Sequence, residues 1–520
     1  MISIEDLLAL TSIDNLAVDD ALNVIAILID HATDQSDLDL TDRAHAFCDA
    51  LERCELSPSE QALLDYYRSN GWNNRRQPSR QDRAAAWAWE QPELQNQVFF
   101  LRRALNNPGF DNLPPIRRCQ ILTNLANQMD TAGRFVEARA YWTQALAIDP
   151  DFWMARGNRG SGLTRYGKAL YDDGHQVVFG LFAHRELTAA VDAASRKPHL
   201  GDPAARDHYL QRIASIEGVF VLDEIAKTYV PDGHALGKSK KERSYRNWCL
   251  RNTLFLNPLN DLEARSIAAR DVLTLPSFVT DLNEPPVMIG FFNQMKQEFV
   301  SARWLYYEAE QETKKHFSDR NVLLFNTLDY PTYGLSVEKL KLSFRSAYSL
   351  FDKIAFFLNY YMELGIPHKK VSFRSIWREK DGAPIRTQFE TSENWPFRGL
   401  YWLSKDLFEE GCRDLTEPNA QALNEIRNHL EHKYIKVHDM LMPRRTEPGA
   451  NIDRFSDTLA YALTQTDLER KALRLLKLAR AALIYLSLGM HSEEQRRRTQ
   501  RGQDALLAEM SLPKWEDWKK

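Results

Sequence analysis

An arginine and a histidine lie five residues apart in the segment Arg427-Asn428-His429-Leu430-Glu431-His432. Histidine titrates near neutral pH, so it can accept or donate a proton during a reaction. The arginine guanidinium stays charged and can bind two phosphate oxygens at once. With the polar Asn428 between them, Arg427 on a phosphate and His432 in proton transfer would suit metal-free cleavage of a phosphodiester.

The surrounding sequence, EPNAQALNEIRNHLEHKYIKVH, predicts a helix with Asn419 as a possible cap. Asn428 and His432 are four residues apart and share one face of such a helix. Arg427 and His432 diverge by about 140°, so either Arg427 reaches around the helix or the helix bends. One copy supplies one histidine where the reaction needs an acid and a base. We therefore expect two copies to face each other across a two-fold axis.

Four helical segments in this part of the chain predict a compact bundle. The first begins at Ser336 and stops at Gly365, and the second begins near Asn394. The third carries the motif, and the fourth runs from about Asp467. Residues 442–453 are expected to form the loop between the third and fourth helices.

Motif and position together resemble the HEPN superfamily, whose ribonucleases carry an arginine, usually a polar residue, and a histidine a few residues later. Arg427, Asn428 and His432 match that pattern. The opening helix and the Asn-rich block at 245–262 look like a bacterial branch in which this module follows tetratricopeptide-like helices. The resemblance implies a metal-independent endoribonuclease that leaves a 2′,3′-cyclic phosphate, acts as a homodimer and serves as a toxin or antiviral-defence effector.

Two other interpretations of the motif remain open. Arg427 and Glu431 could form an ion pair along an exposed helix, with the histidines as surface residues. His429, Glu431, His432 and the following His438 could instead bind zinc, although the spacing is not H-E-x-x-H and no distal ligand is evident. We expect no metal and no cofactor, and the chain has no Walker phosphate loop.

In the first part of the chain, from Ile4 to about Val230, apolar residues recur at intervals of three and four, which predicts a series of helices. Its segment LANQMDTAGRFVEARAYWTQALAIDP has the spacing of a tetratricopeptide (TPR) repeat, at Leu125, Ala126, Ala138, Trp142, Ala145 and Pro150. Small alanines would let two helices approach closely, and Gly133 would make the turn. We expect a protein or peptide trigger or inhibitor to bind in the concave groove of this region.

Composition sets broader limits. The 520 residues exceed what one hydrophobic core usually contains, and the charge of −4 excludes nucleic-acid binding through overall positive charge. Five scattered cysteines suggest a reduced, cytoplasmic protein. The acidic N-terminus and the absence of a long apolar run predict neither a signal peptide nor a membrane partner.

The sequence therefore predicts an all-α protein in four parts. Residues 1–230 would be the TPR-like repeat region, 231–330 a connecting helical segment, 331–500 the HEPN four-helix bundle and 501–520 a C-terminal tail. Residues 233–247 are expected to be an exposed connection, and 288–316 one long helix.

The predicted activity is cleavage of RNA, regulated by the TPR-like region. The alternative is a non-catalytic helical scaffold that binds RNA or a protein. The nuclease hypothesis requires Arg427 and His432 to reach an open cleft. The scaffold hypothesis allows both side chains to be buried by neighbouring residues.

Overall fold

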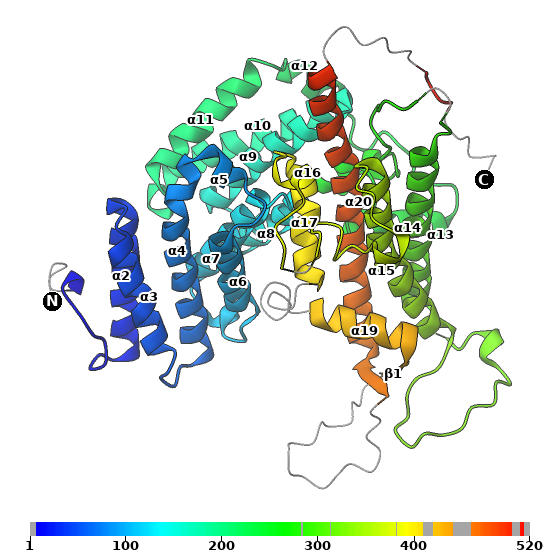
Figure 1. The fold of residues 1–520 in the computed structure, drawn as a ribbon, viewed down its shortest axis with the longest axis horizontal. Coiled ribbons are helices and arrows are strands. Elements are labelled where there is room, and N and C mark those ends of the chain that lie inside the picture. Colours follow the sequence, from blue (N-terminus) through cyan, green and yellow to red (C-terminus); the bar gives the residue numbers. More distant parts are fainter. Residues whose placement is uncertain are drawn as a thin grey trace.

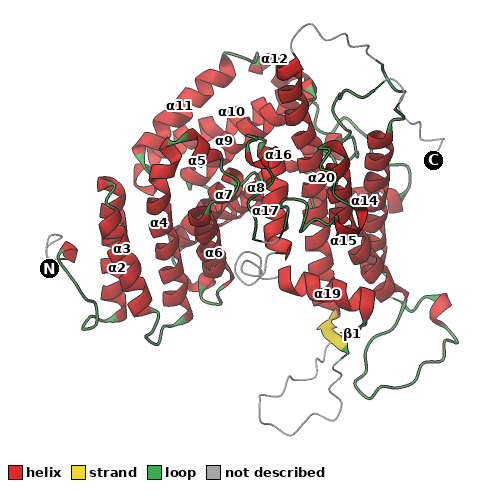
Figure 2. Cartoon of the chain, in the orientation of Figure 1, coloured by secondary structure: helices red, strands yellow, loops and turns green. Residues whose placement is uncertain are grey.

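The computed structural model describes residues 7–281, 284–312, 314–380, 382–408, 420–439, 459–501 and 510–513. Over these residues the fold is all-α, as predicted, with a small two-stranded sheet as the exception (Figure 2). None of the described helices combines the length and the apolar character that a membrane span needs.

In the N-terminal part, successive helices pack on one another in a curved array (Figure 1). They are α2 (Val18–Gln35), α3 (Leu38–Leu51), α4 (Pro58–Gln81), α5 (Arg83–Trp87), α6 (Pro92–Asn106), α7 (Pro115–Thr131), α8 (Phe135–Ile148), α9 (Trp153–Ala169), α10 (Asp173–Arg196), α11 (Pro203–Glu217) and α12 (Leu222–Thr228), with short 3₁₀ turns η1 (Phe110–Asn112) and η2 (Pro198–Leu200). A capping box starts α4, since Ser57 and Glu60 each accept a hydrogen bond from the other's backbone N–H.

The segment with TPR spacing forms the helical hairpin of α7 and α8. Ala126 and Ala138 are fully buried between the helices, and Gly133 turns the chain with a φ of 89°. The Trp142 indole donates a hydrogen bond to the Asn127 side chain at 3.0 Å. The predicted turn and close approach are therefore present, while assignment of the region to the TPR class stays a prediction.

The C-terminal part contains a bundle in which α14, α15, α17 and α20 pack together and α19 packs across α15 and α17 (Figure 1). Its elements and the connection before it are α13 (Lys240–Arg251), η3 (Pro258–Asp261), η4 (Ser266–Ala268), α14 (Val287–Gln311), η5 (Phe317–Asp319), α15 (Leu335–Tyr361), η6 (His368–Lys370), α16 (Thr387–Glu390), α17 (Trp395–Phe408), α19 (Ala420–His432) and α20 (Gln465–Arg501). Strands β1 (Tyr434–His438) and β2 (Ala460–Thr464) pair in parallel, with Tyr434 opposite Ala460.

The predicted helices of the bundle are confirmed as α15, α17, α19 and α20, and the long helix of the connecting segment as α14. The predicted cap Asn419 and the predicted loop 442–453 lie outside the described residues. Residues 233–247 include no buried residue, as expected of an exposed connection, but their second half is helical. Helix α13 begins there because the Ser239 hydroxyl accepts a hydrogen bond from the Glu242 N–H at 3.1 Å.

A buried ion cluster joins the N-terminal helices to the bundle through α17. Asp406 on α17 is 2% exposed, and Arg102 of α6 donates to both of its carboxylate oxygens at 3.0 Å. Arg134, just before α8, binds the same carboxylate and pairs with Glu137 at 2.6 Å. Arg474 of α20 reaches Glu137 at 3.1 Å, so four helices meet at one cluster.

The backbone of α17 also lies in direct contact with the turn between α7 and α8. A Cβ on Gly399 would lie 2.2 Å from the carbonyl oxygen of Gly133, a distance that no side chain could occupy. Next to this contact the Trp395 indole donates to the Asp130 carbonyl at 2.7 Å. Helix α17 therefore packs directly against backbone of the N-terminal array.

The Asn-rich block provides a second buried connection, to α20. Arg480 pairs with Asp261 at 2.8 Å and donates to two backbone carbonyls of the block, and both side chains are almost fully buried. The Tyr166 hydroxyl of α9 donates to the same Asp261 carboxylate at 3.0 Å. The block thus ties the last helix of the bundle to the N-terminal array, a role that its composition did not reveal.

Replacing Asp406 by asparagine is expected to destabilise the protein strongly. Arg102 would lose the carboxylate that it binds and Arg134 would keep only Glu137, and breaking a buried ion pair costs about 3–5 kcal/mol. Urea unfolding followed by circular dichroism measures the change. Asp111→Asn is the matched control, because Asp111 is largely exposed beside Arg118 and its pair contributes at most about 1 kcal/mol. Equal midpoints for the two variants would contradict the role of the cluster.

Candidate functional site

Helix α19 is held in place by one apolar face. Leu423, Ile426 and Leu430 recur at intervals of three and four residues and are all buried. This face packs on α15 and α17, which leaves the end of α19 near the surface. The motif occupies the last two turns of the helix, and β1 begins two residues after it.

Arg427 is half-buried and points toward α15. Its guanidinium lies over the Tyr348 ring, 5.7 Å from the ring centre, and donates a hydrogen bond to the Asn428 side-chain oxygen at 3.0 Å. A cation over an aromatic ring is stabilised by about 0.5–1 kcal/mol at a partly exposed site. These contacts fix the direction of Arg427 and place Asn428 beside it.

His432 is exposed at the C-terminal end of α19. Within the described residues no hydrogen bond joins it to Arg427. Helix α19 continues without a break to His432, and positions five residues apart on a helix diverge by about 140°. One chain thus holds Arg427 and Asn428 together and presents His432 separately to solvent.

Arg345 is a component of this site that the sequence did not indicate. Its guanidinium donates to the Leu430 carbonyl and pairs with Glu431 at 3.4 Å. Among the described residues, Glu431 pairs with Arg345, and no ion pair joins it to Arg427. Arg345 lies three residues before Tyr348 on α15, and that helical spacing is the signal that could have linked it to the motif.

The other residues of the zinc interpretation have separate contacts. His429 Nδ1 lies 2.8 Å from the Glu425 carbonyl, and its ring packs near that of Tyr461. His438 is buried in β1. In the part of the chain that is described, no three His, Cys, Asp or Glu side chains are arranged to hold a metal ion.

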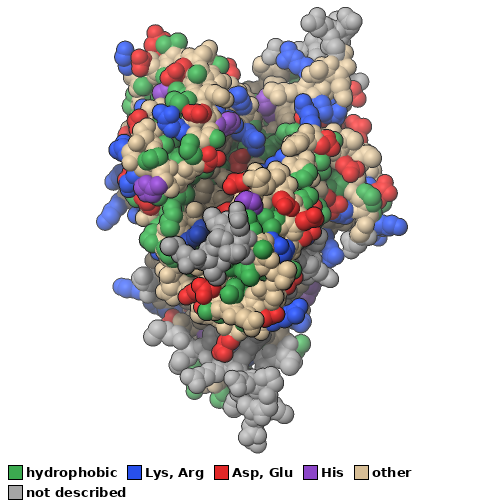
Figure 3. Space-filling model, turned by 90° about the vertical axis from the view of Figure 1, so that its left-hand side faces the viewer, with side chains coloured by type: hydrophobic (Ala, Val, Ile, Leu, Met, Phe, Trp, Pro, Cys, Tyr) green, Lys and Arg blue, Asp and Glu red, His purple; other side chains and the backbone are tan. Residues whose placement is uncertain are grey.

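Surface charge is mixed across the face drawn in Figure 3, where basic and acidic side chains alternate without a large area of one sign. This agrees with the net charge of −4. Any contact with a nucleic acid backbone therefore depends on local groups such as Arg427 and Arg345.

Residues 279–493 match the family model described as LA2681-like HEPN, so a HEPN domain occupies the C-terminal part of the chain. The match includes the motif, and as a class such domains indicate nuclease or RNA-related activity. It starts before residue 331, and our domain boundaries remain predictions. No curated protein and no solved structure matches the chain.

Arg345→Ala is expected to loosen the end of α19 without unfolding the bundle. Losing its hydrogen bond to the Leu430 carbonyl should cost about 0.5–1.5 kcal/mol, enough to speed local opening roughly 2- to 13-fold. Hydrogen exchange of a peptide covering 425–433 measures this. Arg470→Ala is the control, since Arg470 is exposed and pairs only along α20. Unchanged exchange in Arg345→Ala would remove Arg345 from the site.

Proposed function

We propose that the protein is a metal-independent endoribonuclease of the HEPN type. The observation that carries the proposal is the motif at the end of α19, with Arg427 and Asn428 joined by a hydrogen bond and His432 exposed. An arginine held by an aromatic ring and an amide is oriented before a phosphate arrives, which lowers the entropy lost on binding.

The reaction follows from these groups. The ribose 2′-oxygen attacks the neighbouring phosphorus while its proton passes to a base, and the bond to the 5′-oxygen breaks as an acid protonates that oxygen. His432 carries out one of these two proton transfers. Arg427, with Asn428 beside it, stabilises the charge that grows on the phosphoryl oxygens. The products are a 2′,3′-cyclic phosphate and a 5′-hydroxyl.

A second copy of the chain would supply the other histidine. Support comes from the 317–333 segment, which exposes many apolar side chains and whose last residues reach β1 (Figure 1). They include Phe317, Val322, Leu323, Leu324, Phe325, Leu328 and Tyr330. The Thr332 N–H donates to the Val437 carbonyl, and Lys436 forms a buried pair with Asp329, so the segment is fixed near the motif. Such an apolar surface is typical of an interface, and we propose that it forms a homodimer.

The N-terminal helices would regulate this activity. We propose that they are TPR-like, bind a protein or peptide trigger or inhibitor, and make the protein a toxin or antiviral-defence effector. Their buried connection to α17 supports the idea, because binding to one part can then affect the other.

His432→Ala and Arg427→Ala are expected to abolish RNA cleavage by the purified protein. Loss of a general acid–base group lowers a rate about 10²- to 10⁴-fold, and loss of a charge-stabilising donor about 10²- to 10³-fold. Fragments are separated on a gel, and their ends are tested for cyclic phosphate. His199→Ala is the control, as an exposed histidine of the N-terminal part.

If all these variants cleave alike, the activity does not come from this site. RNA binding without cleavage by the wild type, in the presence of candidate triggers, would instead favour the non-catalytic scaffold.

Replacing Leu323 and Phe325 together by aspartate is expected to convert the dimer into monomers. Both side chains are more than 80% exposed in one chain, so the change should spare the fold while charging the proposed interface. Light scattering after gel filtration gives the mass, and cleavage should fall with dimerisation. Val219→Asp, at an exposed apolar site of the N-terminal part, is the control. A wild-type monomer that cleaves RNA fully would refute the two-copy site.

A further inference from the structure

A cavity of about 520 Å³ lies between the N-terminal helices and α17, far along the chain from the motif. Cationic, amide and indole side chains line it, among them Arg76 and Arg80 of α4, Asn127 of α7, Trp87 of α5 and Arg398 of α17. Its size lies within the range of small-molecule sites in proteins, about 300–1,000 Å³.

Three of its four arginines form no ion pair with a described residue, whereas the fourth, Arg165, pairs with Asp130 at 3.1 Å. Arg76 donates to the side-chain oxygens of Gln91 and Gln128, and Arg80 to that of Asn73. Arg398 is 2% exposed, yet its Nε and one terminal nitrogen have no hydrogen-bond partner there. A buried donor without a partner is unfavourable by about 1–3 kcal/mol, more when it is charged. This guanidinium therefore points to a missing acceptor.

The pKa values of two arginines that line the cavity are lowered by burial and by neighbouring positive charges. Burial, together with the charges of Arg80 and Arg398, lowers the pKa of Arg76 to about 9. Burial and Arg165 lower the pKa of Arg398 to about 10. Burial is the larger cause of both shifts, and a bound anion would stabilise the charged form of each arginine against burial and repulsion alike.

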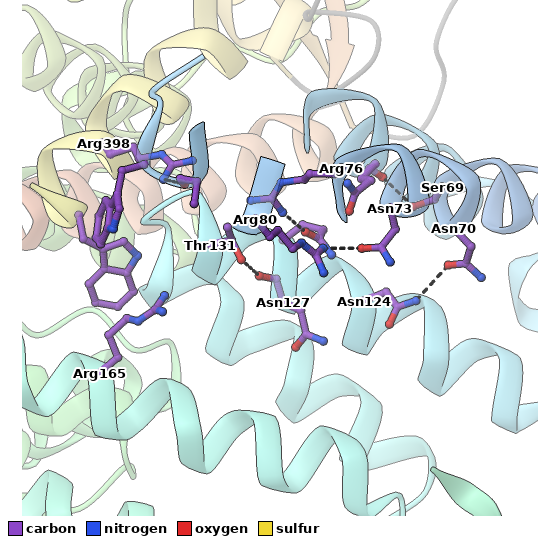
Figure 4. A pocket seen from close by; sticks show the side chains of 15 residues that line it. Ser69, Asn70, Asn73, Arg76, Arg80, Asn124, Asn127, Thr131, Arg165 and Arg398 are labelled. Atoms are coloured by element: carbon purple, nitrogen blue, oxygen red, sulfur yellow. Dashed lines mark hydrogen bonds between the residues drawn. The ribbon is translucent and has the colours of Figure 1, made fainter. Parts of the chain in front are cut away.

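The other lining groups suit more than a bare anion. Figure 4 shows Arg398 and Arg165 at one end of the cavity, Asn70 and Asn124 at the other, and Arg80 between them. Amide side chains offer both donors and acceptors, as the edge of a nucleobase does. The indoles of Trp87 and Trp395 also line the cavity, and the Arg165 guanidinium lies over the Trp395 ring, 5.1 Å from its centre. The Trp395 ring therefore belongs to the end of the cavity where the arginines lie.

We propose that this cavity binds a mononucleotide, with its phosphate on the arginines and its base among the amides. The volume of about 520 Å³ is large enough for one nucleotide. Because the ligand would contact α4, α7 and α17 together, its binding would strengthen the connection between the N-terminal array and the HEPN domain. This proposal stands independently of the nuclease activity.

Isothermal titration of the full-length wild type with AMP, GMP, CMP and UMP tests the site. At least one is expected to bind once per chain, and Arg80→Gln and Asn73→Asp should each weaken it at least tenfold, since a charge-assisted contact is lost or an opposing charge is added. Arg80 and Asn73 are used because the almost fully buried Arg398 could be needed for folding. Arg75→Gln is the matched control on the same helix, where Arg75 instead pairs with Asp42.

Several results would overturn the proposal. Absence of binding by all four nucleotides at millimolar concentration is one, and equal affinity in Arg80→Gln and Arg75→Gln is another. Orthophosphate binding as tightly as the nucleotide would show a simple anion site. Binding of a hexaglutamate peptide without nucleotide binding would assign the cavity to an acidic peptide.

Discussion

The arrangement of the N-terminal helices and the HEPN domain depends on the ion pairs of the buried Asp406 carboxylate. The carboxylate faces Arg102 and Arg134 in an environment that hardly contacts water, and none of the three charges can be left alone there without a large penalty. Helix α17 must therefore stay against α6 and the α7–α8 turn. The close approach of Gly399 to Gly133 requires the same position, since any side chain at either glycine would push the helix away.

Helix α17 in turn positions the HEPN motif. Its neighbour α19 packs on α15 and α17, so the orientation of Arg427 over Tyr348 depends on helices that are themselves fixed from the N-terminal side. The pair of Arg480 with Asp261 fixes α20 in the same manner. The HEPN domain is therefore packed into the rest of the chain and shares a hydrophobic core with it, which spans residues from Trp89 to Met490.

The elements that could be predicted from the sequence are those that a local residue pattern specifies. Apolar residues at intervals of three and four, with caps and turn residues, predicted the bundle helices and the α7–α8 hairpin. The paired strands were missed because each is only five residues long. Contacts such as Arg102 with Asp406 join residues about 300 positions apart, and no spacing rule reveals them. The cavity is lined by residues of several helices, so no single stretch of sequence marks it as a phosphate loop does. Arg345 could be assigned to the site only from the contact between α15 and α19.

Helix α17 also limits how a ligand in the cavity could influence the motif. Arg398 lines the cavity, and Asp406 two turns later anchors the ion cluster, so the same rigid element bears both. A ligand can shift the motif only if it binds two positions of α17 with different affinity. Because a second position would have to keep the Asp406 charge paired, small displacements of α17 alone are disfavoured. Movement of α17 together with α6 and the α7–α8 hairpin keeps both arginine pairs intact and would carry α19 with it. Ligand binding that only tightens the present contacts would instead hold the site in its present position.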